Sequence, residues 1–163
     1  MKKLIIFDLD GTLLNTIADL AHSTNHSLQT LGYPTHEVAS YNFMVGNGIN
    51  KLFERALPEG EKTVASNKYQ AATEKLIAHY FPGIRFVAVF GQREGVKVKP
   101  DPTVVHDILR IAGVSKDEVL YVGDSGVDMQ TAINSGVTSC GVTWGFRPRT
   151  ELESFCPDYI ADK

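Results

Sequence analysis

The chain opens on a short run in which every position is apolar. This run, Leu4 to Phe7, lacks the alternation of a half-exposed strand, so it predicts a strand buried on both faces. It ends at two carboxylates, Asp8 and Asp10. Because residues two apart in an extended chain point to the same side, both side chains are expected on one face.

After this strand the apolar positions recur at helical spacing. The pattern predicts helices over residues 13–31 and 47–57, followed by a polar turn at 58–62. Strands and helices then alternate along the chain. The expected strands cover 63–65, 86–90, 118–122, 139–144 and 159–161, and the expected helices cover 68–80, 102–112, 127–135 and 150–154.

This alternation predicts an α/β fold, a three-layer Rossmann-like parallel sheet with helices on both faces. The two helices after the first strand break the rhythm. We therefore expect a core of residues 1–14 and 63–163 and a helical insertion over 15–62.

Composition narrows the function classes. The 163 residues carry a formal net charge of −3, which has the wrong sign for a general nucleic-acid binder. No apolar run reaches membrane-spanning length, and Asp8 interrupts the first run too early for a signal peptide. Cys140 and Cys156 lack metal-site spacing and are expected as free thiols of a cytoplasmic protein. The sequence carries no signal of oligomeric state.

Polar residues follow several of the expected strands. The carboxyl ends of parallel strands meet at one edge of a sheet, where ligands bind. Asp128 lies one helical turn after Asp124 and is expected to face the same point. The residues expected at this edge are Asp8, Asp10, Ser66, Asn67, Lys99, Asp124, Ser125 and Asp128.

Four carboxylates at one edge would repel one another, and a hard divalent cation resolves the repulsion. Mg²⁺ suits a site with few carboxylates and a substrate phosphate. Lys99 and the hydroxyl of Ser66 add groups that bind a tetrahedral anion. A carboxylate at Asp8 can then attack phosphorus, and Asp10 can protonate the leaving oxygen and later activate water.

These residues resemble the motifs of the haloacid dehalogenase superfamily, and of its phosphoglycolate phosphatase-like branch with a helical cap. Asp8-Leu9-Asp10-Gly11-Thr12 matches the first motif, and Ser66-Asn67 resembles the second. Lys99 before Pro100 resembles the third motif, and Gly123-Asp124-Ser125 with Asp128 resembles the fourth.

The resemblance implies a role for each matching position. Asp8 would be the nucleophile and Asp10 the acid/base. Mg²⁺ would be held by the side chains of Asp8 and Asp124 and by the backbone carbonyl of Asp10. Residues 15–62 would form the cap. The remaining implied roles are phosphate binding by Thr12, Ser66, Asn67 and Lys99, and support by Ser125 and Asp128.

The chain departs from the family in its middle. The family returns from the cap through a linker, a helix and a full strand, whereas only Pro58 to Ala65 precede Ser66 here. We expect two or three elements to be absent, including a central strand, either because the protein is shortened or because residues are missing. The family also usually adds a last helix beyond the position of Lys163.

The resulting prediction is a Mg²⁺-dependent phosphomonoester phosphatase that acts on a small phosphorylated metabolite, with 2-phosphoglycolate as the candidate. The alternatives are a sugar-phosphate mutase and a non-catalytic phosphate-binding module. Arg147 and Arg149 are expected on an exposed loop, with proximity to the substrate as the alternative.

Overall fold

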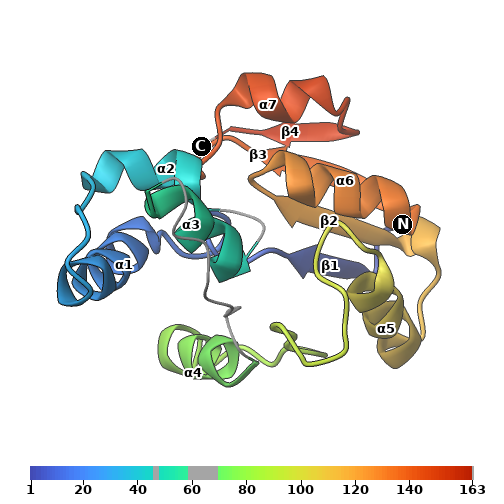
Figure 1. Ribbon diagram of the computed structural model, residues 1–163. Helices are drawn as coiled ribbons and strands as arrows, with labels where there is room; N and C mark the ends of the chain where they lie inside the picture. Colours follow the sequence, from blue (N-terminus) through green and yellow to red (C-terminus); the bar gives the residue numbers. More distant parts are fainter. Residues whose placement is uncertain (46–47, 59–69, 163) are drawn as a thin grey trace.

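The computed structural model describes residues 1–45, 48–58 and 70–162. Its centre is a parallel sheet, as the sequence predicts, and the strands lie in the order β1-β2-β3-β4 (Figure 1). All neighbouring strands are parallel, so their carboxyl ends meet at one edge. The strands are β1 (Leu4–Phe7), β2 (Val119–Gly123), β3 (Thr138–Val142) and β4 (Tyr159–Ala161).

Helices α5 (Thr103–Ala112) and α6 (Gly126–Ser135) pack on one face of the sheet. Helix α7 (Arg149–Ser154) lies on the same side, where Leu152 is buried against Gly141 of β3. A short 3₁₀ turn, η2 (Lys116–Glu118), leads into β2. The main core joins β1 and β2 to α5 and α6 through Ile6, Val105, Leu109, Val119, Tyr121, Ala132 and Val137.

Local chemistry accounts for the helix limits. Asp101 accepts a hydrogen bond from the backbone N–H of Thr103 at 3.0 Å, which stabilises the first turn of α5. Helices α5 and α6 both end at a glycine in the left-handed conformation, Gly113 and Gly136. The sequence predicts these ends correctly.

A separate group of helices follows β1. Helices α1 (Ile17–Thr30), α2 (Tyr41–Met44) and α3 (Gly48–Ala56), with the 3₁₀ turn η1 (Val38–Ser40), form what we call the helical unit. The unit has its own small core of Ala21, Tyr41 and Leu52. The buried Tyr41 hydroxyl donates to Asn25 of α1 at 2.7 Å, which joins α2 to α1.

The prediction of a strand over residues 86–90 is wrong. This segment lies beyond α4 (Gln70–Tyr80) and has no strand pairing. A strand needs a neighbour for its backbone groups, and the described residues supply none beside it. The side chain of Gln70 bonds there instead, donating to the Val89 carbonyl at 2.6 Å and accepting from Gly91 N–H at 2.6 Å.

The prediction that β1 is buried on both faces is also wrong. Within the described residues β1 is an edge strand, and Ile5 and Phe7 keep 50% and 44% of their surface exposed. Only the face bearing Ile6 is packed against α5 and α6. A cavity of about 760 Å³ lies along β1, α5 and the segment 85–92.

Two further predictions, the polar turn at 58–62 and the short strand over 63–65, lie mainly or wholly outside the described residues. The remaining predicted strands and helices agree with the structure to within a few residues, whereas α2 was not predicted. No helix formed by the described residues is long and apolar enough to cross a bilayer.

Candidate active site

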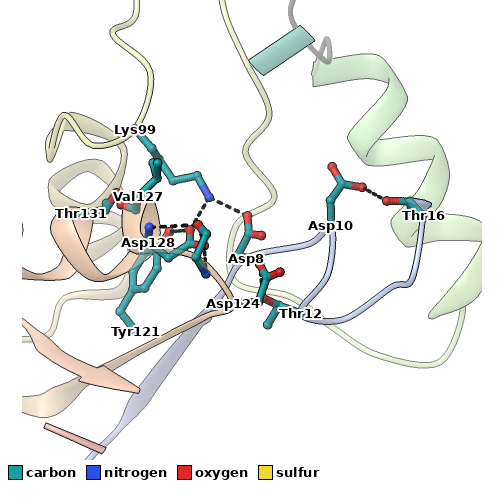
Figure 2. A network of polar contacts seen from close by, with 11 residues as sticks. Asp8, Asp10, Thr12, Thr16, Lys99, Tyr121, Asp124, Val127, Asp128 and Thr131 are labelled. Carbon is teal, nitrogen blue, oxygen red and sulfur yellow. Dashed lines mark hydrogen bonds and ion pairs between the residues drawn. The ribbon is translucent and has the colours of Figure 1, made fainter. Parts of the chain in front are cut away.

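Asp8 and Lys99 meet at the carboxyl end of β1. The Lys99 ammonium lies 2.6 Å from Asp8 Oδ1 and 2.6 Å from Asp128 Oδ1, so it bridges two carboxylates (Figure 2). Lys99 comes from the loop before α5, and Asp128 comes from the first turn of α6. The sequence prediction that this lysine reaches the sheet edge is confirmed by these distances.

Asp124 and Asp128 come from the junction between β2 and α6. Ser125 is the N-cap of α6, and its side chain donates to Asp128 Oδ2 at 2.5 Å. The Ser125 backbone N–H donates to the same oxygen at 3.2 Å. This reciprocal cap orients Asp128 toward the sheet edge. A carboxylate oxygen from each of Asp8, Asp124 and Asp128 lies within 4.8 Å of the others.

The site is buried and its charges interact strongly. Asp124 and Asp128 are 3% and 1% exposed. Burial raises the pKa of the Asp8 carboxyl to about 7, and the charge of Asp128 adds to this, while Lys99 opposes it. Burial and the charge of Asp128 also raise the pKa of Asp124 to about 6, against the hydrogen bond from Phe146 N–H.

The lysine responds to the same neighbours. Burial by itself would lower the pKa of Lys99, but Asp128 and Asp8 raise it well above its ordinary value. Lys99 therefore stays cationic among the acids. Burial also raises the pKa of Tyr121, whose hydroxyl donates to Asp128 Oδ1 at 3.3 Å.

The donor set fits a hard divalent cation. Three carboxylates and one lysine leave two uncompensated negative charges in a buried space. A divalent cation would neutralise them, and carboxylate oxygens are the ligands that hard cations prefer. The acid cluster is therefore a candidate metal centre.

Asp10 points away from this cluster. Its Oδ1 accepts a hydrogen bond from the Thr16 hydroxyl at 2.7 Å, on the far side of the β1 loop (Figure 2). The chain leaves the extended conformation after Asp8, so the two-residue spacing no longer places Asp8 and Asp10 on the same side. Thr12 lies between them and donates to Asp124 Oδ1 over a long 3.5 Å.

A loop after β3, residues Trp144–Arg147, contacts the site, and this role was not expected from the sequence. The Phe146 N–H donates to Asp124 Oδ2 at 2.7 Å, and the Trp144 indole donates to the Thr12 carbonyl at 3.0 Å. Gly145 packs so closely that a Cβ there would lie 2.2 Å from Asp124 Cβ. Gly11, at φ +90°, leaves equally little room on the other side of Asp124.

The expectation that Arg147 lies on an exposed loop is wrong. Its side chain is only 15% exposed, and it donates to the Val45 carbonyl of the helical unit at 2.6 Å. Arg149, in contrast, is half-exposed on α7, where it pairs with Glu153 and Asp162. The predicted phosphate-binding residues Ser66 and Asn67 lie outside the described residues.

A parallel sheet with helices and an acid cluster and lysine at its carboxyl edge places this chain among the Rossmann-like α/β proteins that carry their site at that edge. The sequence profile described as haloacid dehalogenase-like hydrolase matches residues 5–87 and 63–142. The chain belongs to this family. The two matches overlap at residues 63–87, which adjoin the place where family elements are expected to be absent from this chain.

Curated relatives carry a more specific name. Phosphoglycolate phosphatase of Vibrio parahaemolyticus is 28% identical over 210 aligned positions, with 98% of this chain and 92% of the relative covered. Phosphoglycolate phosphatase of Pseudomonas putida is 26% identical, covering 99% of this chain and 77% of the relative. Both alignments are longer than the 163 residues of this chain, so these relatives have residues without a counterpart here.

Solved structures agree with the fold. A crystal structure titled as a putative phosphoglycolate phosphatase from Lactobacillus delbrueckii is 25% identical, with a TM-score of 0.87 and 100% and 95% of the two chains covered. A haloacid dehalogenase-like hydrolase from Bacteroides fragilis, 19% identical, has a TM-score of 0.84 over 98% of this chain and 96% of that one. The Rossmann-like core of the family is therefore present.

Proposed function

We propose that this chain is a Mg²⁺-dependent phosphomonoester phosphatase that works through an aspartyl phosphate on Asp8. The observation that carries the proposal is the position of Asp8, which shares the Lys99 ammonium with Asp128 and a potential cation site with Asp124 and Asp128. A nucleophilic carboxylate needs nearby positive charge to approach a phosphoryl group. Lys99 supplies part of that charge.

In the proposed mechanism, one oxygen of Asp8 attacks phosphorus and the ester P–O bond breaks. Protonated Asp10 gives its proton to the leaving alkoxide. Water then attacks the phosphorus of the aspartyl phosphate, and Asp10 takes up a proton from this water. The bond between phosphorus and Asp8 breaks, which releases phosphate and regenerates the Asp8 carboxylate. Because Asp10 bonds to Thr16 in this structure, its carboxylate must rotate toward the leaving group for this role.

The other residues hold the phosphoryl group and its charge. Bound Mg²⁺, held by Asp8, Asp124 and the carbonyl of Asp10, would supply electrostatic stabilisation of the phosphoryl oxygens. Lys99 would contact a further phosphoryl oxygen, with Thr12, Ser66 and Asn67 as additional phosphate ligands. Ser125 and Asp128 support the site, since the cap of α6 fixes Asp128 and Asp128 orients Lys99.

The substrate class follows from the relatives. The activity for which these relatives are named supports a small phosphorylated metabolite as the substrate, with 2-phosphoglycolate as the candidate. We assign residues 1–14 and 63–163 to the core and 15–62 to a cap, supported by the separate small core of the helical unit. The two free cysteines support the cytoplasm as its location.

The test is the substitution Asp8→Asn, assayed with 2-phosphoglycolate and with p-nitrophenyl phosphate. The amide is a poor nucleophile, so hydrolysis of both should fall by at least about a thousandfold. The matched control is Asp19→Asn on the exposed side of α1, which should keep full activity.

Two outcomes would contradict the proposal. Substantial turnover by a pure Asp8→Asn preparation would remove Asp8 as the nucleophile. A wild-type chain that binds inorganic phosphate but hydrolyses neither ester would favour the phosphate-binding module, an alternative motivated by the residues that the relatives carry and this chain does not.

A further inference from the structure

One contact joins the helical unit to the loop that braces the acid cluster. The Arg147 guanidinium donates to the Val45 carbonyl at 2.6 Å. Val45 is the residue at which α2 ends, and its side chain packs on the small core of Ala21, Tyr41 and Leu52. The hydrogen bond from Arg147 to this carbonyl therefore holds the packed part of the helical unit.

Phe146, the residue directly before Arg147, binds the acid cluster. Phe146 donates its N–H to Asp124 Oδ2 at 2.7 Å, directly before Arg147. Consecutive residues thus fix a candidate metal ligand and the helical unit. A shift of the 144–147 loop would change both positions together, and this links the placement of the unit to the site.

The Arg147 side chain is itself held in place. Its Nε lies 3.8 Å from Glu151 Oε2, and the other oxygen of Glu151 accepts from the Gly126 N–H at the start of α6 at 2.9 Å. The side chain is only 15% exposed. A partly buried, charged donor with fixed neighbours makes a stronger contact than a mobile surface side chain.

Arg147 lines two cavities. A cavity of about 390 Å³ separates Phe43 and Arg55 of the helical unit from Val127, Arg147 and Phe155 of the core. Arg147 also lines the larger cavity that contains Asp8, Lys99 and Asp124. The unit is thus held across a gap, and Arg147 stands between that gap and the acid cluster.

From this geometry we propose that Arg147 is a positioning residue that holds the helical unit over the phosphate site and so sets affinity for the leaving group of the substrate. The proposal rests on the proposed phosphatase function. Arg147 acts through the Val45 carbonyl and not on the phosphoryl group. Its loss should therefore raise KM for a metabolite that the unit must enclose, with little effect on transfer from an activated ester.

The experiment compares wild type, Arg147→Ala and Arg147→Lys with the matched control Arg149→Ala. For 2-phosphoglycolate, Arg147→Ala should lower kcat/KM roughly tenfold, mainly through KM, because a charge-assisted hydrogen bond is lost. For p-nitrophenyl phosphate the change should stay within about twofold. Arg147→Lys should recover part of the loss, since it keeps one charged donor, and Arg149→Ala should match wild type.

A readout independent of activity is amide hydrogen exchange in α2 and in residues 51–56 of α3. Arg147→Ala should speed exchange there and leave α5 and α6 unchanged. If wild type hydrolyses neither ester, the proposed function fails, while the exchange data still test the grip on the helical unit. Equal losses with both esters together with a lower melting temperature, or unchanged exchange and kinetics, would overturn the role of Arg147.

Discussion

At the scale of residues, the acid cluster shows why strand ends are informative in a parallel sheet. Asp8, Asp124 and Asp128 were predicted to meet because each follows, or lies one helical turn beyond, a strand end, and the structure places their oxygens within 4.8 Å. The helix cap at Ser125 adds the precision that spacing alone lacks, because it fixes the direction of Asp128.

Metal binding by the acid cluster can be tested without measuring catalysis. Mg²⁺ held by this cluster in the folded chain should raise the melting temperature of wild type by several degrees at about a hundredfold excess over its Kd. Asp124→Asn should lose most of this shift, since it removes one of three clustered carboxylates. The measurement is thermal unfolding with and without Mg²⁺, and with a chelator as reference.

The chelated samples provide a second check. Without metal, Asp124→Asn should be at least as stable as wild type, because fewer crowded negative charges repel one another. Asp107→Asn, a surface acid of α5 that pairs with Arg110, is the control and should keep the full Mg²⁺ shift. An equal shift in Asp124→Asn and wild type would exclude Asp124 as a ligand.

Other site residues could not have been found from the sequence. Phe146 contributes only a backbone N–H, which every residue except proline carries, so side-chain type gives no signal. Thr16 would ordinarily be interpreted as a helix cap, yet its hydroxyl holds Asp10. Gly11 and Gly145 must both be glycine because a Cβ at either position would clash with Asp124. This requirement arises only where two loops, distant in the sequence, enclose Asp124.

At the scale of elements, local patterns predicted the pieces whose neighbours are present. Helices α5 and α6 end at the expected glycines, and β2, β3 and β4 lie where apolar runs occur. The segment 86–90 has an equally strong apolar pattern and forms no strand. Periodicity records a preference for strand, whereas pairing requires a partner that only the folded chain provides.

The strength with which β4 is attached to β3 should depend on pH. Asp158, just before β4, accepts hydrogen bonds from Ser139 N–H at 2.8 Å and from Ser139 Oγ at 2.9 Å. The backbone hydrogen bond from Ser139 is the largest cause that lowers the pKa of Asp158 below its ordinary value. Because its pKa is lower in the folded state, the charged Asp158 stabilises the fold at any pH above its unfolded-state pKa. This stabilisation is lost as the pH falls through the folded-state pKa.

Asp158 is exposed and solvent screens its charge, so Asp158→Ala should lower the free energy of unfolding by no more than about 1 kcal/mol at neutral pH, through the lost hydrogen bonds from Ser139. The difference from wild type should begin to shrink below about pH 4, the ordinary pKa of an aspartate, and should vanish as the pH falls through the lower pKa of folded Asp158. Asp158→Asn keeps an acceptor without the charge, so it should be intermediate and nearly independent of pH. Urea unfolding from pH 2.5 to 7 measures this, and a constant wild-type difference would contradict it.

At the scale of the whole molecule, the unusual feature is the open edge of the sheet. The apolar run predicts that β1 is buried on both faces, whereas in the described residues it lies at the edge with Ile5 and Phe7 half-exposed. The relatives carry residues that this chain lacks, and the two profile matches overlap at residues 63–87. An edge strand with apolar side chains is a known route to aggregation because its backbone groups can pair with another chain.

This arrangement gives a direct test with two neighbouring positions. Ile5→Lys places a charge on the exposed side of β1 and should cost no more than about 1 kcal/mol, because half of the side chain already contacts water. It should also reduce light scattering during thermal unfolding, since charge on an edge opposes strand pairing. Ile6→Lys, directed into the packed face with Ile6 only 8% exposed, should cost roughly 3–5 kcal/mol.

The comparison of the two variants decides whether the edge is open in solution. Melting temperature and scattering are measured on both, and a large gap between them supports an uncovered β1. If Ile5→Lys destabilises the fold as much as Ile6→Lys, then Ile5 is covered in solution and β1 is an interior strand of a larger sheet. That outcome would mean that β1 is covered here by something other than the residues that only the relatives carry. The reason is that an interior position cannot accept an unpaired charge at low cost.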